Sequence, residues 1–260
     1  MKERAGGPGD WQSRWRRMVK GVVGVNSSEG EQELLESLDR TSKPLVLAFV
    51  NAHAMNCAAE SPEFFDAVTA ADVVLRDGMG MAILLRLLGQ SPGLNLNGTD
   101  LIPKIVRRFA GRPMALFGTE EPYLARARET VNTRLAPGSA CITAHGFLDT
   151  ATYLRLAAEH RPSLIVLGMG MPRQEEVARA LRGSLAFPCL VVCGGAIIDF
   201  LGGKTSRAPA WMRTLGIEWL FRLVLEPRRL FKRYVIGNPL FIARALSLAA
   251  ATPRGDRAAT

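Results

Sequence analysis

The sequence lacks the short motifs that usually mark a metal or nucleotide site. Its four cysteines form no Cys-x-x-Cys pair, its three histidines show no metal-ligand spacing, and no Asp-x-Asp pair occurs. The dinucleotide fingerprint Gly-x-Gly-x-x-Gly and the phosphate-loop pattern Gly-x-x-x-x-Gly-Lys are absent as well. These absences argue against a zinc site, an NAD site and a P-loop ATP site, and they favour chemistry without a metal ion or cofactor.

Long apolar runs are also missing. No stretch reaches the roughly 18 uninterrupted apolar residues that a membrane-spanning helix needs, and the basic N-terminal segment has no apolar run long enough for a signal peptide. Three of the four cysteines lie in apolar or helical stretches, so we expect buried free thiols in a reducing compartment. The sequence therefore predicts a cytoplasmic protein, whose surface is still free to contact a membrane.

Positive charge is in excess and is concentrated near the C-terminus. The 260 residues include 33 Lys and Arg against 24 Asp and Glu, a net charge of +9. Between residues 204 and 244, nine Lys and Arg stand against two Glu, which supplies +7 of that net charge. Such a balance indicates an anionic partner, which is a membrane surface, a nucleic acid or a phosphorylated substrate.

Aromatic residues alternate with these basic residues, among them Trp211, Trp219, Phe231 and Tyr234. This mixture favours a surface helix that lies in an anionic bilayer interface. A solvated basic face above ordinary core aromatics is a second interpretation, and a nucleic-acid surface is a third. Charge and aromatic content alone leave all three open.

Six short β-rich apolar runs alternate with longer helical patterns. The runs lie at 44–50, 71–75, 112–118, 139–144, 162–170 and 187–195. The stretches between them, such as 120–134 and 172–184, are charged on one side and rich in Ala, Leu and Arg. Continuous apolar strands separated by helices predict an α/β fold, with a mostly parallel sheet covered by helices on both faces.

Polar and small residues gather where each predicted strand ends. They lie at 51–53, 76–80, 118–121, 145–147, 168–175 and 194–200. Ligands of parallel sheets bind beyond the carboxyl ends of the strands, so these segments are candidates for one shared site. Glycines there let the backbone approach a ligand, and amides at helix starts suit phosphate.

The segment 168–175, GMGMPRQE, combines these features. Pro172 suits the first turn of a helix, where its missing N–H costs nothing. Arg173 is placed to meet an anion, and Gln174 is placed to hydrogen-bond a neutral polar group such as a sugar hydroxyl. A tight turn remains the alternative interpretation of the Gly-x-Gly pattern itself.

Asp77 is the sharpest single candidate for catalysis. It lies between an apolar strand and a glycine turn, where a carboxylate can accept a proton from a substrate hydroxyl. The alternative is a turn-forming aspartate that caps the following helix. Spacing alone leaves both interpretations open.

Longer motifs resemble the WecG/TagA/CpsF family of bacterial glycosyltransferases. The motifs are NAHAMNCAAESPEFFDAVTAADVVLRDGMGM, NGTDL, LFGTEE, HGF, LGMGMPRQE and GGAIIDFLGGKTSRAPAWMRTLGIEWLFRLVLEPRRLFKRYVIGNP. They occur in the family's order from about residue 45 to residue 241, and the stretch from Gly194 to Pro239 is long and specific.

The resemblance implies an inverting, metal-independent transfer of a hexose from a UDP-sugar to a polyprenyl-diphosphate-linked sugar. The sugar is N-acetylmannosamine in well-known members, and the product serves bacterial cell-surface polysaccharide synthesis. The resemblance also implies a Rossmann-like core and a basic helical C-terminal appendage. That appendage is expected to close over the active site and to hold the protein at the inner face of the cell membrane. No cofactor is expected.

Residue roles follow from the matching motifs. Asp77 is expected to be the general base, and Asn51 to contact the sugar or its acceptor. Gln174 is expected to contact the donor, and Asp199 to lie beside the nucleotide. These three catalytic candidates, Asp77, Asn51 and Gln174, come from three different predicted strand ends.

Further substrate contacts are expected within the same motifs, at Gly118, Thr119, Gly170, Arg173 and Arg207. The basic residues of the appendage are a second group, in which one or more arginines are expected to meet the diphosphate and to replace a metal ion. They are Arg222, Arg228, Arg229, Lys232 and Arg233.

The expected organisation has four parts. Residues 1–30 form a flexible basic N-terminus, 31–203 the Rossmann-like core, 204–250 the appendage, and 251–260 a disordered tail. Association of copies through the core is possible. A non-catalytic UDP-sugar-binding protein and a basic nucleic-acid-binding module are the alternative functions; the first would tolerate loss of Asp77, and the second would not require polar residues at strand ends.

Overall fold

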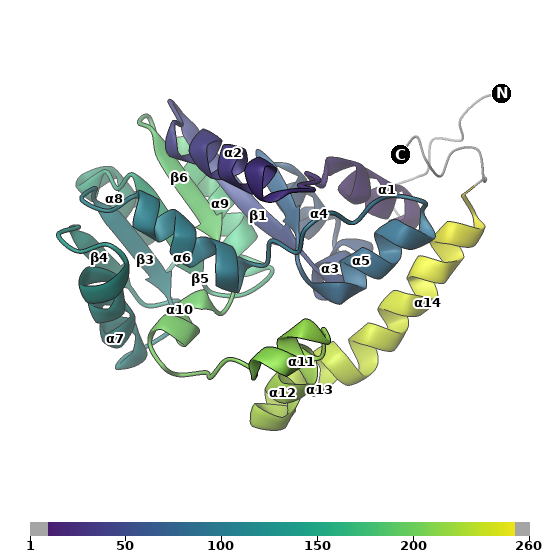
Figure 1. Cartoon of the computed structure of the whole chain (residues 1–260). Helices are drawn as coiled ribbons and strands as arrows, with labels where there is room; N and C mark the ends of the chain where they lie inside the picture. Colours follow the sequence, from purple (N-terminus) through teal and green to yellow (C-terminus); the bar gives the residue numbers. More distant parts are fainter. Residues whose placement is uncertain (1–9, 253–260) are drawn as a thin grey trace.

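One sheet of six strands forms the centre of the molecule, and every neighbouring pair of strands is parallel (Figure 1). The computed structural model describes residues 10–252. The strand order is β2-β1-β6-β5-β3-β4. This confirms the predicted parallel α/β sheet. The strands are β1 (Pro44–Val50), β2 (Val73–Arg76), β3 (Met114–Gly118), β4 (Cys141–Ala144), β5 (Leu164–Gly168) and β6 (Cys189–Cys193).

Helices connect and cover these strands. Up to the last strand they are α1 (Trp11–Gly21), α2 (Ser28–Asp39), α3 (Ala52–Glu60), α4 (Pro62–Thr69), α5 (Gly78–Leu87), α6 (Gly98–Arg108), α7 (Tyr123–Thr130), the π-helical turn η1 (Val131–Leu135), α8 (Thr150–His160) and α9 (Arg173–Ser184). After the last strand follow α10 (Ile197–Leu201), α11 (Ala210–Thr214), α12 (Glu218–Leu225), α13 (Pro227–Phe231), the π-helical turn η2 (Lys232–Ile236) and α14 (Gly237–Ala250).

Successive side chains of each strand point to opposite faces of the sheet, so an apolar core forms on each face. Leu47 and Phe49 of β1 pack with α2, α6 and α7 on one face, whereas Val46 and Ala48 pack with α8 and α9 on the other. A third apolar cluster joins α1, α3, α4, α5 and α14 beside β1 and β2. Because both faces are covered, every strand reads as a nearly continuous apolar run.

The N-terminal region differs from the flexible segment expected over residues 1–30. Residues 11–21 form α1, whose first turn is capped by Asp10, and α2 begins at Ser28. Trp15 is completely buried and donates its Nε1–H to the Met55 carbonyl over 2.7 Å. Residues 11–21 are thus helical within the segment expected to be flexible, because basic side chains obscured the apolar face that α1 buries against α3. Residues 1–9 and the end of the expected tail, 253–260, lie outside the described part of the chain.

The C-terminal segment has two different environments. Helices α11 to α13 lie beyond the carboxyl ends of the strands, and α14 then runs back beside α3 and α1 (Figure 1). Phe241 of α14 is buried against Trp15, with ring centroids 5.3 Å apart. The predicted unit 204–250 therefore contains a helix, α14, that also completes an apolar cluster of the core. The boundary at residue 203 stays a prediction.

A buried polar pair begins α9. Gln174 and Glu175 are only 1% and 2% exposed. The Gln174 side chain accepts a hydrogen bond from the Gly195 amide over 2.9 Å and donates one to Glu175 Oε1 over 2.8 Å. It thus joins the exit of β6 to the start of α9. Burial raises the pKa of the Glu175 carboxyl to about 8, so this group keeps its proton at neutral pH.

We predict that Glu175 makes stability fall as pH rises from about 5 to 8. In that window the folded protein retains a proton that the unfolded chain loses, so the free energy of unfolding decreases with pH. Glu175→Gln should remove this dependence and, because a pKa unit is worth about 1.4 kcal/mol, should raise the melting temperature at pH 8 by several degrees. At pH 4.5 the gain should vanish.

Thermal unfolding monitored by circular dichroism at several pH values measures this effect. Glu176→Gln, at the exposed neighbour, is the matched control and should follow the wild type. Equal pH dependence in Glu175→Gln and the wild type would contradict the prediction.

Candidate active site

A cavity of about 650 Å³ lies at the carboxyl ends of β1 and β2. Its walls come from the starts of α3 and α5, from the loop that precedes α6, and from α11, α12 and η2 of the C-terminal segment. Four residues predicted from the sequence line it, namely Asn51, Asp77, Arg222 and Arg233. The first two lie more than 140 positions before the last two in the chain, so the fold alone brings the two pairs together.

Asp77 occupies the first position after β2, and its amide donates to the Val50 carbonyl over 2.8 Å. It stands at the N-cap position of α5, but its side chain makes no capping hydrogen bond. The side chain accepts instead from Asn51 Nδ2 over 3.4 Å. Its carboxyl borders the cavity yet is surrounded by protein, and this burial raises its pKa, against the opposing effects of Asn51 and Arg233. The geometry therefore favours a proton acceptor over a helix cap.

Asn51 caps helix α3 and at the same time orients the Asp77 carboxylate. The Asn51 side-chain oxygen accepts from the Ala54 amide over 3.1 Å at the start of α3. That bond turns the amide nitrogen towards Asp77. Asn51 thus holds the carboxylate in place from the neighbouring strand.

Arg222 of α12 and Arg233 of η2 bring positive charge into the same cavity. Within residues 10–252, the buried Nε atoms of both guanidinium groups have no hydrogen-bond partner. Burial lowers the pKa of Arg233, and Asp77 opposes this shift. Buried donors without acceptors are costly, so the pair is suited to an anionic ligand with several oxygens.

The other predicted basic residues do not line this cavity. Arg207 donates to Asp100 over 2.6 Å, and Arg229 pairs with Glu226. Arg228 and Lys232 are exposed. The structure therefore separates the basic cluster into two cavity arginines and a set of surface cations.

A second group of predicted residues meets at the exits of β3, β5 and β6. The Thr119 hydroxyl donates to the Asp199 carboxylate, and Thr119 adopts a left-handed backbone with φ of 49°. Gly118 approaches the Gly168 backbone so closely that an added Cβ would lie 2.4 Å from the Gly168 carbonyl oxygen. Gly170 and Gln174 belong to the same strand exits. This group adjoins the sheet edge but does not line the cavity around Asp77.

Arg173 has a different partner from the predicted anion. Its guanidinium donates to the Leu148 carbonyl, at the turn that precedes α8. The contact of Arg173 with an anion stays a prediction. To make it, the guanidinium would have to keep the Leu148 carbonyl as a second acceptor or break that hydrogen bond.

Two further cavity residues, Arg76 and His53, lie within segments that the sequence marked as candidates but had no individual role assigned to them. Arg76, at the end of β2, donates to the Gly93 carbonyl over 2.7 Å and to Asn95 Oδ1 over 3.2 Å, which ties the 92–95 loop to the cavity. His53 lines the wall beside Arg233, and burial lowers the pKa of its imidazole to about 4. An arginine at the end of an apolar strand was the one signal in the sequence that pointed to Arg76.

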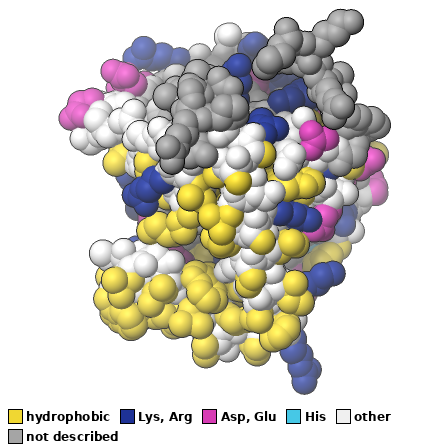
Figure 2. Space-filling view, turned by 90° about the vertical axis from the view of Figure 1, so that its right-hand side faces the viewer, with side chains coloured by type: hydrophobic (Ala, Val, Ile, Leu, Met, Phe, Trp, Pro, Cys, Tyr) yellow, Lys and Arg dark blue, Asp and Glu magenta, His cyan; other side chains and the backbone are white. Residues whose placement is uncertain are grey.

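Exposed apolar side chains gather on the C-terminal segment. Figure 2 shows them at the lower end of the molecule. We call this the C-terminal apolar surface, and it consists of Trp211, Leu215, Leu220, Val224, Leu225, Phe231, Val235 and Ile236. Val224 is 72% exposed and Leu215 is 63% exposed, which is unusual for side chains of this kind. Between residues 10 and 252, no helix has the length and apolar character needed to cross a bilayer.

Comparison with known proteins assigns the chain to a family. A relative from Bacillus subtilis (strain 168) is 24% identical over 188 residues, which cover 71% of this chain and 73% of the relative. A relative from Staphylococcus aureus (strain NCTC 8325 / PS 47) is 23% identical over 196 residues, covering 74% and 76%. Both are named N-acetylglucosaminyldiphosphoundecaprenol N-acetyl-beta-D-mannosaminyltransferase.

The family model described as "Glycosyl transferase WecG/TagA/CpsF family" matches residues 21–255. That range includes the whole sheet, the cavity and the C-terminal segment. The expected resemblance is thereby confirmed, and the chain belongs to the WecG/TagA/CpsF family of glycosyltransferases.

Proposed function

We propose that the protein transfers N-acetylmannosamine or a related hexose from a UDP-sugar to a polyprenyl-diphosphate-linked sugar. The names of the two relatives support this acceptor and this sugar. The observation that carries the proposal is the arrangement of the cavity, where the half-buried Asp77 carboxylate, which caps no helix, shares the space with Arg222 and Arg233. A base beside two unsatisfied guanidinium groups suits the attack of a hydroxyl on a sugar diphosphate.

In the proposed reaction, Asp77 removes the proton from the acceptor hydroxyl while the hydroxyl oxygen attacks the anomeric carbon of the donor. The bond from that carbon to the UDP oxygen breaks, and its electron pair stays on the leaving diphosphate. Asp77 keeps the proton. A single displacement of this kind inverts the anomeric carbon, so an α-linked UDP-sugar gives a β-linked product.

In this proposal Arg222 and Arg233 supply the positive charge that a metal ion provides in other glycosyltransferases. Arg222 and Arg233 neutralise the charge that develops on the UDP as it leaves. Their donors are already oriented and largely excluded from water, so little reorganisation is needed during the reaction. The proposal places the Thr119–Asp199 pair at the nucleotide end of the donor, where the buried Gln174 supports the strand exits through its bond to the Gly195 amide.

We also propose that the C-terminal apolar surface docks on the inner face of the cell membrane. The same segment forms this surface on its outside and one wall of the cavity on its inside. Arg228 and Lys232, both exposed, add positive charge that suits anionic lipid headgroups. Docking would bring the cavity to a lipid-linked acceptor without extracting the lipid from the bilayer.

Replacement of the base should separate catalysis from binding. Asp77→Asn should lower the rate of sugar transfer at least 100-fold, because general base catalysis is worth about 10²–10⁴. Its Kd for UDP should stay within about twofold, since the amide keeps the shape of the site. Radiolabelled sugar transfer and calorimetric titration with UDP measure the two quantities.

Asp66→Asn, at an exposed position of α4, is the control for the charge change and should behave as the wild type. Full transfer by Asp77→Asn with normal UDP binding would refute the assignment of the base. It would also favour a protein that binds UDP-sugars without using this carboxylate.

Loss of a cavity arginine should weaken nucleotide binding. Removing a charge-assisted hydrogen bond costs roughly 1.5–3 kcal/mol, so Arg222→Ala and Arg233→Ala should each raise the Kd for UDP about 10- to 100-fold. Arg228→Ala, at the surface, should change it less than twofold. Arg233→Lys keeps the buried charge and should retain the fold while binding UDP more weakly than the wild type.

Calorimetric titration of the four variants distinguishes the two sets of cations. Equal loss of UDP affinity in Arg228→Ala and Arg233→Ala would show that the cavity does not select the diphosphate.

Membrane docking should depend on the C-terminal apolar surface. The triple variant Trp211→Ser, Val224→Ser, Phe231→Ser removes three exposed side chains and should not disturb the core. We expect it to lose flotation with vesicles of phosphatidylglycerol and phosphatidylethanolamine while it keeps UDP affinity. The matched control is Val23→Ser with Phe147→Ser, which changes exposed apolar residues elsewhere. Undiminished flotation of the triple variant would overturn the docking surface.

A further inference from the structure

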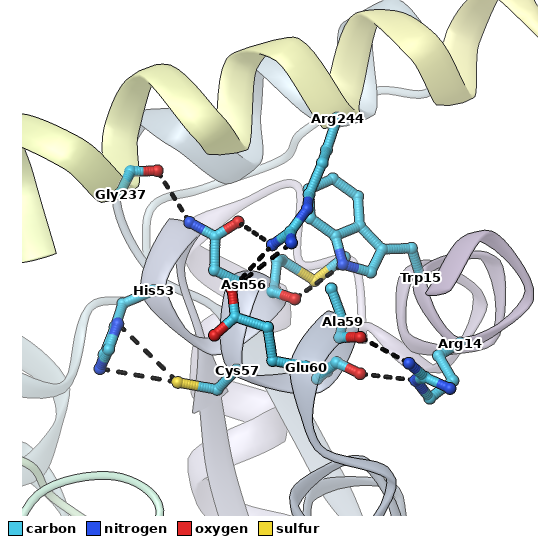
Figure 3. A network of polar contacts seen from close by, with 11 residues as sticks. Arg14, Trp15, His53, Asn56, Cys57, Ala59, Glu60, Gly237 and Arg244 are labelled. Atoms are coloured by element: carbon cyan, nitrogen blue, oxygen red, sulfur yellow. Dashed lines mark hydrogen bonds and ion pairs between the residues drawn. The ribbon is translucent and has the colours of Figure 1, made fainter. Parts of the chain in front are cut away.

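Arg233 reaches the cavity from a segment outside the sheet, so a contact is needed to fix its position. Figure 3 shows a network of polar contacts centred on α3, with α14 on one side of it and α1 on another. Helix α3 begins immediately after Asn51, the residue that holds Asp77. The same helix therefore touches both the base and the C-terminal segment.

One face of α3 carries polar side chains at helical spacing. Asn56 and Cys57 follow His53 by three and four positions, and Glu60 follows them by four and three, so these side chains lie on adjacent turns of one side. His53 faces the cavity, whereas Asn56 and Glu60 meet α14. This stripe lies in a helix whose other buried residues, such as Met55 and Ala58, are apolar.

Asn56 is the buried member of the stripe, at 6% exposed. Its Nδ2 donates to the Gly237 carbonyl over 2.7 Å, and its Oδ1 accepts from Arg244 Nη1 over 3.0 Å (Figure 3). A carbonyl requires the amide nitrogen and a guanidinium requires the amide oxygen, so only one orientation of the side chain satisfies both partners. The contact joins residues 181 positions apart.

Gly237 is the junction between η2 and α14. It is the first residue of α14, and its amide donates back to the Lys232 carbonyl at the start of η2. Arg233 belongs to that same five-residue π-helical turn. A bond that fixes Gly237 therefore fixes the end of the short segment from which Arg233 enters the cavity.

We propose that Asn56 is a positioning residue for sugar transfer, which acts by holding the η2–α14 junction so that Arg233 faces Asp77. The inference rests on the proposed function, because it assigns Arg233 to the donor diphosphate. The Asn56–Gly237 hydrogen bond is the essential link. The ion pair of Arg244 with Glu60, whose side chain is 63% exposed, contributes less since solvent screens it.

The experiment measures UDP affinity and transfer rate in Asn56→Ala, in Arg233→Ala and in the double variant. If Asn56 acts through Arg233, Asn56→Ala alone raises the Kd for UDP about fivefold or more and lowers the transfer rate similarly. In the Arg233→Ala background the same change has less than a twofold effect, because the group that Asn56 positions is gone.

Two further variants separate positioning from general stability. Asn56→Asp keeps an acceptor for Arg244 but cannot donate to Gly237, so it should bind UDP as poorly as Asn56→Ala. Trp15→Phe removes the Met55 hydrogen bond on the α1 side of the same helix. It should lower the melting temperature comparably while leaving the Kd for UDP within twofold of the wild type.

Hydrogen exchange gives a readout that does not depend on activity. Asn56→Ala should speed the exchange of amides 232–237, whereas Trp15→Phe should not.

Equal effects of Asn56→Ala with and without Arg233, or unchanged exchange at 232–237, overturn the inference. A wild-type protein that transfers no sugar overturns the proposed function instead, and the inference falls with it. Transfer by the wild type with unaltered kinetics in Asn56→Ala overturns the inference alone.

Discussion

The placement of the Asp77 carboxylate in one cavity with the half-buried guanidinium groups of Arg222 and Arg233 is the constraint on which the proposed site depends. A charged group removed from water is tolerated only where a protein group or a ligand supplies an opposite charge and hydrogen-bond partners. Five arginines line the cavity against two carboxylates, Asp77 and Glu218, so the cavity keeps an excess of positive charge. The proposed chemistry uses this imbalance, since a sugar diphosphate supplies the missing negative charge.

The fold creates this interaction from distant parts of the chain. A parallel sheet delivers Asn51 and Asp77 to one edge, because β1 and β2 end side by side in register. The sheet cannot deliver the arginines, which arrive on short helices after the last strand. Helix α3 connects the two parts, since Asn51 precedes it, Asn56 binds the η2–α14 junction, and Trp15 supports it from α1. The C-terminal apolar surface and one wall of the cavity thus belong to one segment.

The sequence predicts the sheet and the position of Asp77 at the end of a strand, because both depend on local patterns. Apolar runs between helical stretches locate all six strands, and the residue after a strand is fixed at the sheet edge. The choice among the arginines depends on which side of a short helix faces inward, and elements of five to eight residues have too few turns to show it. Asn56 escapes prediction for another reason, since its partners, Gly237 and Arg244, lie far away in the sequence. Basic residues likewise hid the buried face of α1.

The anomeric configuration of the product shows whether the sugar is transferred by a single displacement. The purified protein would be incubated in nanodiscs with a panel of UDP-hexoses and a short prenyl-diphosphate-linked sugar, and the new linkage would be read from its proton coupling constants by NMR. We expect the protein to release UDP only when the acceptor is present. One donor should be preferred, and the product should be β-linked. An α-linked product, or UDP release that ignores the acceptor, would contradict a single displacement driven by Asp77.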